Sequence, residues 1–287
     1  MTEQVQQVVG FLGRGVVPPD QPVIVADDLG LTRGDGVFDA TRVVIDGAGR
    51  RVDNLEAHLA RFVRSIGLLE GPAPDLDAWR RLIAEAVAAC PFTGEAILKI
   101  IWTRGRESVH TDPVGLLTIT PMTSAAVAQR AGVRVAALSR GVASDAFADA
   151  PWLLGGAKSL SYGVNVAVKR EAARRGADDV LFVSTDGYCL EGPTSALVVA
   201  FGDRLVTTPR GATGILASIT QEIIFEAATA AGWRTASELL RAEQLAGADG
   251  SWLVSSVRGA APILELDGRP LPQNADLTAR VVGWSGF

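Results

Sequence analysis

The sequence has few of the residues on which hydrolytic and metal-dependent reactions rely. Among its 287 residues there are two histidines and two cysteines, and none of them lie at the spacing of a metal site. No Gly-x-Ser-x-Gly nucleophile elbow is present. A serine-hydrolase triad and a metal centre are therefore not predicted. Cys90 and Cys189 lie far apart, which favours buried free thiols of a reducing compartment over a disulfide.

Long basic runs and long apolar runs are also missing. The formal net charge is -5, so a charged surface for nucleic acid is not expected. No apolar stretch reaches membrane-spanning length, and the first ten residues, MTEQVQQVVG, lack the pattern of a signal peptide. With 48% hydrophobic and 21% charged residues, the composition is that of a folded globular protein. We expect a cytoplasmic protein without a membrane or nucleic-acid partner.

Hydrophobic periodicity predicts a mixed α+β or α/β chain in two lobes. Residues 122–132 are small and polar with little periodicity, which indicates a linker between a lobe of residues 1–121 and a lobe of residues 133–287. Strands are expected over 22–26, 40–45, 50–52, 96–102, 116–120, 133–138, 180–183, 197–201, 205–208, 252–255 and 262–266. Helices are expected from Leu55 onward, over 77–89, from just after Lys158 to about Arg175, over 220–231 and over 239–246.

The stretch from Leu153 to Ser195 could carry amine chemistry. Lys158 follows two glycines and precedes the predicted helix, a setting in which a partly desolvated lysine can form a Schiff base. Tyr162 lies four residues further on, so in a helix both side chains would share a face. Glu191 ends the hairpin strand that follows. Each also has an ordinary interpretation, as a solvated lysine, a core-edge tyrosine and an exposed glutamate.

Three features could form an anion pocket. Residues 214–220, GILASIT, bring backbone N–H groups and the Thr220 hydroxyl to a helix N-terminus. Arg61, on the helix face that it shares with His58, could supply the counter-charge, and Ser255 or Ser256 a hydroxyl. Taken singly, Thr220 could be a plain helix cap, Arg61 a solvated arginine and the serines strand-end residues.

In order along the chain, these pieces resemble the class IV, or fold type IV, pyridoxal-phosphate (PLP) enzymes. That family includes branched-chain and D-amino-acid aminotransferases and 4-amino-4-deoxychorismate lyase. The matching segments span most of the chain: LTRGDGVFDATR, NLEAHLARF, GGAKSLSYGVNVAVKREAARRGADDVLFVSTDGYCLEG, GILASIT and SWLVSSVRGAAPI. The resemblance implies a small α/β lobe and a larger pseudo-barrel lobe with PLP between them, in a homodimer.

By this resemblance, Lys158 carries the cofactor as a Schiff base and moves the substrate proton. Glu191 pairs with the pyridine nitrogen, and Tyr162 bonds the phenolic oxygen of the cofactor. The remaining matches are to phosphate-binding positions, namely Arg61, Ile219, Thr220 and Ser256. The sequence also departs from the family pattern at Asp39, Ser161, Pro193, Ala196, Ala217, Ser218 and Gln221.

The RGDGVF form and the run from PWLLGGAK to EGPTS look most like the lyase branch, which releases pyruvate and 4-aminobenzoate, a folate precursor. Cations for a substrate with two carboxylates could come from Arg104, Arg106 and His110, which a transaminase would need as well. The alternative activity is transamination of D-amino acids or branched-chain amino acids. A non-catalytic PLP-binding or interaction protein of the same fold is a further alternative.

Overall fold

Two compact units make up the chain. The computed structural model describes residues 7–109 and 112–287. The first unit extends to Thr123 and also contains Ala157–Tyr162, whereas Ser124–Gly156 and Gly163–Phe287 form the second. The segment with Lys158 and Tyr162 is thus grouped with the N-terminal unit. The expected linker holds a helix, α4 (Ser124–Ala128), and a 3-10 turn, η1 (Gln129–Ala131). The domain limits inferred from the sequence stay a prediction.

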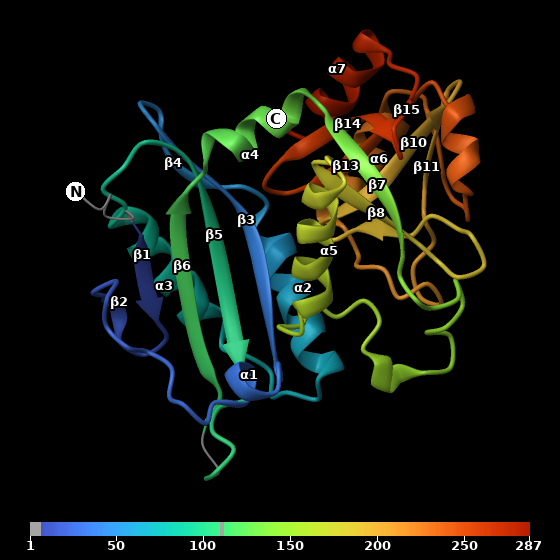
Figure 1. The fold of residues 1–287 in the computed structure, drawn as a ribbon. Helices are drawn as coiled ribbons and strands as arrows, with labels where there is room; N and C mark the ends of the chain where they lie inside the picture. The colour runs from blue at the N-terminus through green and yellow to red at the C-terminus, as the bar shows by residue number, and fades with distance from the viewer. Residues whose placement is uncertain (1–6, 110–111) are drawn as a thin grey trace. The chain divides into compact units, whose positions relative to one another are not determined.

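The first unit is built on a six-stranded antiparallel sheet in the order β2-β1-β6-β5-β3-β4 (Figure 1). Its longest pairing joins β3 to β5 from Gly36↔Thr103 to Ile45↔Gly94. Strand β3 therefore begins at Gly36, four residues before the predicted start at residue 40. The strands are β1 (Val8–Phe11), β2 (Gly15–Val17), β3 (Gly36–Asp46), β4 (Gly49–Val52), β5 (Gly94–Thr103) and β6 (Val114–Pro121).

Two amphipathic helices, α2 (Leu55–Leu68) and α3 (Leu76–Ala88), cover one face of this sheet (Figure 1). Their apolar residues recur at helical spacing and are buried, and Phe62 and Trp79 pack edge to face with ring centroids 5.3 Å apart. A short helix, α1 (Leu29–Thr32), precedes β3. The core of this unit is therefore the layer between one sheet face and two helices.

The second unit holds a nine-stranded mixed sheet, with the main order β12-β11-β10-β13-β14-β7-β8. Strands β11–β12, β14–β7 and β7–β8 pair in parallel, and the other pairs are antiparallel. The strands are β7 (Val133–Ser139), β8 (Asp179–Val183), β9 (Glu191–Gly192), β10 (Ser195–Phe201), β11 (Arg204–Thr207), β12 (Arg234–Ser237), β13 (Gly250–Ser255), β14 (Gly259–Leu266) and β15 (Arg269–Pro270). Together the two units confirm the predicted two-lobed α+β fold.

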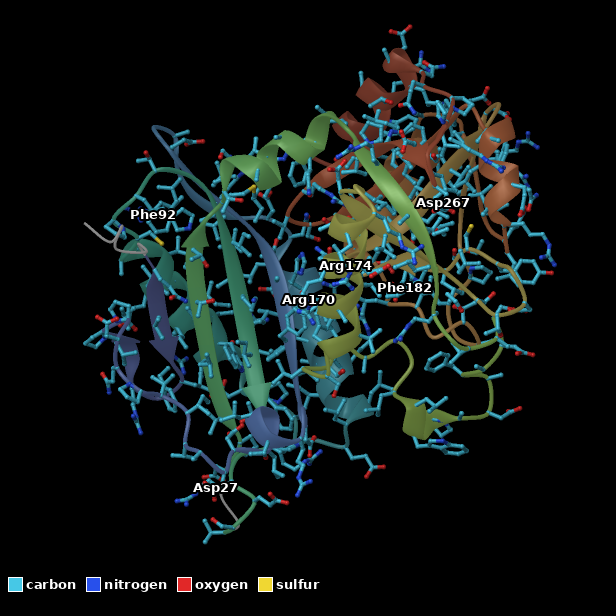
Figure 2. The ribbon with its side chains drawn as sticks, viewed as in Figure 1. Asp27, Phe92, Arg170, Arg174, Phe182 and Asp267 are labelled. Atoms are coloured by element: carbon cyan, nitrogen blue, oxygen red, sulfur yellow. The ribbon has the colours of Figure 1, made fainter. Side chains whose placement is uncertain are left out.

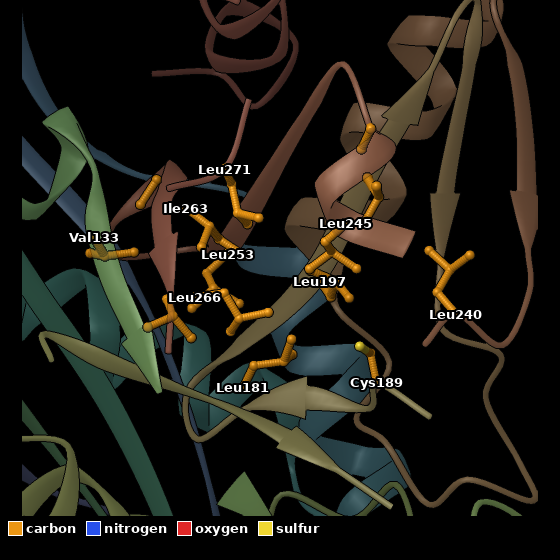
Figure 3. Packing of buried hydrophobic residues seen from close by; sticks show 14 of the residues in the cluster. Val133, Leu181, Cys189, Leu197, Leu240, Leu245, Leu253, Ile263, Leu266 and Leu271 are labelled. Carbon is orange, nitrogen blue, oxygen red and sulfur yellow. The ribbon is translucent and has the colours of Figure 1, made fainter. Parts of the chain in front are cut away.

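A cluster of buried aliphatic side chains fills one face of this sheet (Figure 3). It joins Val133, Leu181, Leu197, Leu253 and Ile263 from five strands, all nearly or fully buried. The helices of the unit are α5 (Gly163–Arg174), α6 (Ile219–Ala230) and α7 (Ala275–Trp284), with 3-10 turns η2 (Pro151–Leu153) and η3 (Ala242–Gly247). Among the described residues, no helix is both long enough and apolar enough to cross a membrane.

Several local predictions are wrong. Residues 22–26 form no strand, because the Val25 carbonyl accepts a turn hydrogen bond from Asp28, whose carboxylate then caps α1. The helix expected over 239–246 is the shorter 3-10 turn η3, since the Leu240 carbonyl is used by Cys189 N–H instead. Strands β1, β2 and β12 and helix α7 were not predicted at all.

The buried aromatic pair gives a test of this packing. Phe62 is 0% exposed, whereas Leu68 on the same helix is 48% exposed. We expect Phe62→Ala to lower the free energy of unfolding by roughly 3–5 kcal/mol, because it opens a cavity beside Trp79. The control Leu68→Ala should change it by less than about 1 kcal/mol. Urea denaturation compares the two variants, and equal losses would show that Phe62 does not lie in the core.

Candidate functional site

Lys158 lies in an extended segment that hydrogen-bonds to β3. Its carbonyl accepts from Phe38 N–H at 2.9 Å, and Leu160 N–H donates to the Gly36 carbonyl at 2.8 Å. Helix α5 begins only at Gly163, so the prediction that Lys158 and Tyr162 share a helix face is wrong. The backbone groups of this segment are satisfied by a neighbouring strand instead of by a helical turn.

The lysine amine nevertheless lies beside Tyr162. Its Nζ is 5.8 Å from the centroid of the Tyr162 ring and 4.6 Å from that of Phe38, and the two rings meet edge to face. Lys158 is half-buried, and its main-chain N–H donates to Ser65 Oγ on α2 at 3.2 Å. Aromatic faces attract an ammonium group while removing water from around it. The amine is thus held in a partly desolvated position.

A buried ion pair fixes Arg61 in the same unit. Both Asp39 oxygens accept from this guanidinium, at 2.8 Å from Nε and 2.7 Å from Nη2. His58 Nδ1 lies 2.8 Å from Asp39 Oδ1, and Asp39 is 1% exposed. The predicted shared face of His58 and Arg61 is therefore present, and one carboxylate on β3 binds both side chains.

The protonation of this cluster follows from its contacts. Burial alone would raise the pKa of Asp39, but hydrogen bonds from Arg61 and His58 outweigh it and hold that pKa far below its usual range. Burial lowers the pKa of His58, so its ring is neutral near pH 7. If Nδ1–H donates to Asp39, Nε2 carries a lone pair, and it has no hydrogen-bond partner in the described part of the chain.

Glu191 lies in the second unit, in the short strand β9 beside β10. Its Oε2 accepts from Leu216 N–H at 3.2 Å, and the side chain is half-buried. It lines a pocket together with Arg140 and Phe182, the latter labelled on the ribbon in Figure 2. The Arg140 guanidinium stacks over the Phe182 ring at 5.1 Å. One carboxylate and one guanidinium thus border the same small space.

The N-terminus of α6 is an anion-binding arrangement. Ser218, and not Thr220, is its cap, accepting from Gln221 N–H at 3.2 Å. The N–H groups of Ile219 and Thr220, in the first turn of this helix, have no acceptor among the residues that the structure describes. Thr220 Oγ1 lies 3.0 Å from Ser256 Oγ, which comes from the end of β13. Two amides and two hydroxyls therefore converge at the positive end of a helix dipole.

Two arginines that were suggested for substrate carboxylates form ion pairs in the first unit. Arg104 Nε lies 2.6 Å from Asp35 Oδ2 and Arg106 Nε lies 3.0 Å from Asp27 Oδ1. Asp27 is labelled in Figure 2. The third suggested residue, His110, lies outside the described residues. A role in substrate binding stays a prediction for all three.

Sequence reasoning did not find the partners of these residues. From the sequence, Asp39 is identified only as a departure from the family pattern. A carboxylate within the apolar strand GVFDATRVV is, however, a signal of a buried charge pair. Arg140 and the amide of Leu216 gave no signal, because their proximity to Glu191 arises from contacts between distant segments.

The comparisons with known proteins agree with this chemistry. The family model described as amino-transferase class IV matches residues 36–266. The chain belongs to the class IV aminotransferase family. A protein of Mycobacterium tuberculosis named bifunctional aminodeoxychorismate lyase / D-amino acid transaminase is 41% identical over 93% of this chain and 94% of its own length.

Solved structures of class IV relatives show the same fold. A fold IV transaminase from Curtobacterium pusillum is 40% identical, covers 98% of this chain and 97% of its own, and superposes with a TM-score of 0.89. A hypothetical aminotransferase from Mycobacterium tuberculosis, solved with α-ketoglutarate and PMP (pyridoxamine phosphate), is 41% identical, with coverage of 97% and 98% and a TM-score of 0.90.

This protein is a PLP-dependent enzyme, as the sequence predicted. Its residues fit the cofactor. Taken separately, the first unit contains a partly desolvated lysine amine and a tyrosine, and the second contains a carboxylate and the amide and hydroxyl cluster at α6. The non-catalytic alternative is not supported by these relatives.

The neutral His58 predicts a pH dependence of stability. The unfolded chain takes up a proton on this residue near pH 6.5, whereas burial lowers the pKa in the native protein. Stability should therefore fall as the pH drops below about 6.5, by up to ~1.4 kcal/mol per pH unit, until native His58 is itself protonated. In His58→Gln, urea unfolding at pH 6.5 and 5.5 should show a shallower decline. An unchanged slope would mean that His58 is protonated in the native state.

Proposed function

We propose that this enzyme is a 4-amino-4-deoxychorismate lyase, releasing pyruvate and 4-aminobenzoate. The observation that carries the proposal is the 41% identity, over nearly the full length of both chains, to a protein whose name includes that activity. The segment from PWLLGGAK to EGPTS, which contains Lys158 and Glu191 and resembles the lyase branch of the family, supports the proposal. Both activities in the relative's name begin at a substrate carbon that bears an amino group.

Lys158 is the proposed catalytic residue. Its amine would anchor the cofactor and, once displaced by the substrate amine, take the proton from the substrate carbon that bears nitrogen. The position of Nζ beside the Phe38 and Tyr162 rings supports this role, because it holds the amine next to the tyrosine that is proposed to contact the cofactor. Tyr162 would donate a hydrogen bond to the phenolic oxygen of the cofactor.

The phosphate would be held by Arg61, by the N–H groups of Ile219 and Thr220, and by the hydroxyls of Thr220 and Ser256. Asp39 would support phosphate binding because it accepts two hydrogen bonds from the Arg61 guanidinium, which then loses little conformational freedom when the phosphate binds. Glu191, oriented by the hydrogen bond from Leu216 N–H, would accept a hydrogen bond from the protonated pyridine nitrogen of the cofactor.

Bound PLP supplies an electron sink for the pair that remains when the substrate proton departs. Lys158 would receive that proton from C4 of the substrate ring, the carbon that bears the amino group. The bond between C3 of the substrate and the enolpyruvyl oxygen then breaks, and the substrate ring becomes aromatic. The three-carbon group takes up a proton and leaves as pyruvate. The two products account for all atoms of the substrate, so no oxidant or second substrate is required.

Transamination of D-amino acids is a second proposed activity. It is favoured by the second half of the relative's name and by the relative solved with α-ketoglutarate and PMP. We also propose that the enzyme is a cytoplasmic homodimer. Trp152 and Leu153, adjacent in η2 and 74% and 47% exposed, support a surface that another copy covers.

The lyase proposal predicts pyruvate release from aminodeoxychorismate. We expect Lys158→Ala to lose activity by at least about 10³-fold, because both the cofactor anchor and the base are removed. Lys169→Ala, an exposed lysine whose Nζ contacts Thr194, is the matched control and should retain activity. A coupled lactate dehydrogenase assay measures pyruvate. No release above the Lys158→Ala background would reject the lyase activity.

The transaminase proposal predicts a half-reaction. Adding a D-amino acid to the PLP-loaded enzyme should shift the cofactor absorbance to that of PMP, and adding α-ketoglutarate should reverse the shift. The same amino acid in the L form is the control and should react more slowly. If neither isomer changes the spectrum while pyruvate is still released from aminodeoxychorismate, the enzyme is a lyase alone.

A further inference from the structure

The turn between β13 and β14 carries Ser256, one of the proposed phosphate contacts. The turn is closed by the pairing of Ser255 with Gly259 and by Arg258 N–H, which donates to Ser255 Oγ at 3.3 Å. Gly259 has a φ of +78°, which favours glycine. Ser256 Oγ reaches Thr220 Oγ1 at 3.0 Å only if this turn keeps its place relative to α6.

The side chain of Arg258 extends from this turn into the interior of the second unit. Its Nη1 lies 2.7 Å from Asp179 Oδ2 and 3.0 Å from Gln129 Oε1. The two charged side chains are 9% and 1% exposed. Asp179 is itself fixed at the start of β8, where its Oδ1 accepts from Val180 N–H at 2.9 Å. A surface turn is therefore tied to the interior of the second unit by a buried charge pair.

Other contacts hold the same turn. Arg130 Nη2 donates to the Val257 carbonyl at 3.3 Å, and the ring of Phe287 lies so close to Gly259 that an added Cβ would be 2.9 Å from it. Arg258 differs from these because it is charged and buried. Its Nε and Nη2 have no hydrogen-bond partner within the described residues, so Asp179 is the group that balances its charge. If the Arg258 side chain moved away, the Asp179 carboxylate would lose the charge that compensates it in the low-dielectric interior, so movement of Arg258 is unfavourable.

We propose that Arg258 and Asp179 are positioning residues for the phosphate of the bound cofactor. This rests on the proposed roles of Ser256 and Thr220 above. Arg258 is not proposed as a phosphate ligand, because its buried guanidinium is paired through Nη1 with Asp179 and Gln129. Arg258 lies two residues after Ser256 in the same turn. By holding this turn, it keeps the Ser256 hydroxyl beside the N-terminus of α6. Weakening the pair lets the turn move and lowers affinity for the phosphate group.

The test compares two ligands that differ only in the phosphate. Apoprotein is titrated with PLP and with pyridoxal, and binding is followed by the absorbance of the cofactor. We expect Arg258→Gln and Asp179→Asn to weaken PLP about fivefold to tenfold, the loss of about one hydrogen bond, and to leave pyridoxal affinity within about twofold. Arg134→Gln is the control, because its exposed pair with Asp178 lies next to Asp179 in sequence but does not hold the turn.

Further variants separate the possible failures. Arg258→Lys retains the charge, which protects the fold, and should show a smaller loss of the preference for PLP. Urea unfolding of each apoprotein confirms that it is folded before titration. If Ser256→Ala keeps the wild-type preference, the phosphate role of Ser256 is wrong and the positioning role falls with it. If Ser256→Ala loses the preference but the Arg258 and Asp179 variants keep it, or weaken both ligands equally, the pair is structural and only the positioning proposal is overturned.

Discussion

Charge that is buried away from water must be neutralised where it lies, and both units of this enzyme meet that requirement with an aspartate–arginine pair. In the first unit, Asp39 on β3 binds Arg61 of α2. In the second, Asp179 on β8 binds Arg258 of the β13–β14 turn. A buried pair contributes little net stability compared with an apolar core of the same shape, but it strongly resists the loss of one partner. Each pair therefore restricts the position of its arginine.

That restriction bears on the cofactor. A phosphate group needs donors that are already in place, because ordering flexible side chains lowers affinity. Arg61 is a proposed ligand held directly by its aspartate, whereas Arg258 is proposed to hold a neighbouring hydroxyl. Lys158 follows the same rule by other means. The backbone pairing of its segment with β3 fixes the lysine backbone, and the Phe38 and Tyr162 rings surround its amine.

Local patterns predicted the long elements well. Helices α2, α3 and α6 and the strands β3 and β5 to β8 contain apolar residues at regular spacing, because these residues are buried. Short edge elements such as β2 and β12 gave no signal, since pairing with a neighbour defines them. The apolar run at 22–26 misled because Val25 is 46% exposed with no strand beside it. Lys158, Tyr162 and Glu191 were found through the order of family motifs, but their contacts with Phe38 and Leu216 join segments far apart in sequence.

Lys158 is the residue proposed to carry the cofactor, and the few lysines of the chain allow a direct measurement. It has three lysines, Lys99, Lys158 and Lys169. Lys99 also approaches the Phe38 ring, with its Nζ 5.9 Å from the centroid. Borohydride reduction of the PLP-loaded enzyme, followed by peptide mass mapping, identifies the lysine that holds the cofactor. A single modified peptide containing Lys158 is predicted, and stoichiometric modification at Lys99 or Lys169 instead would contradict the assignment.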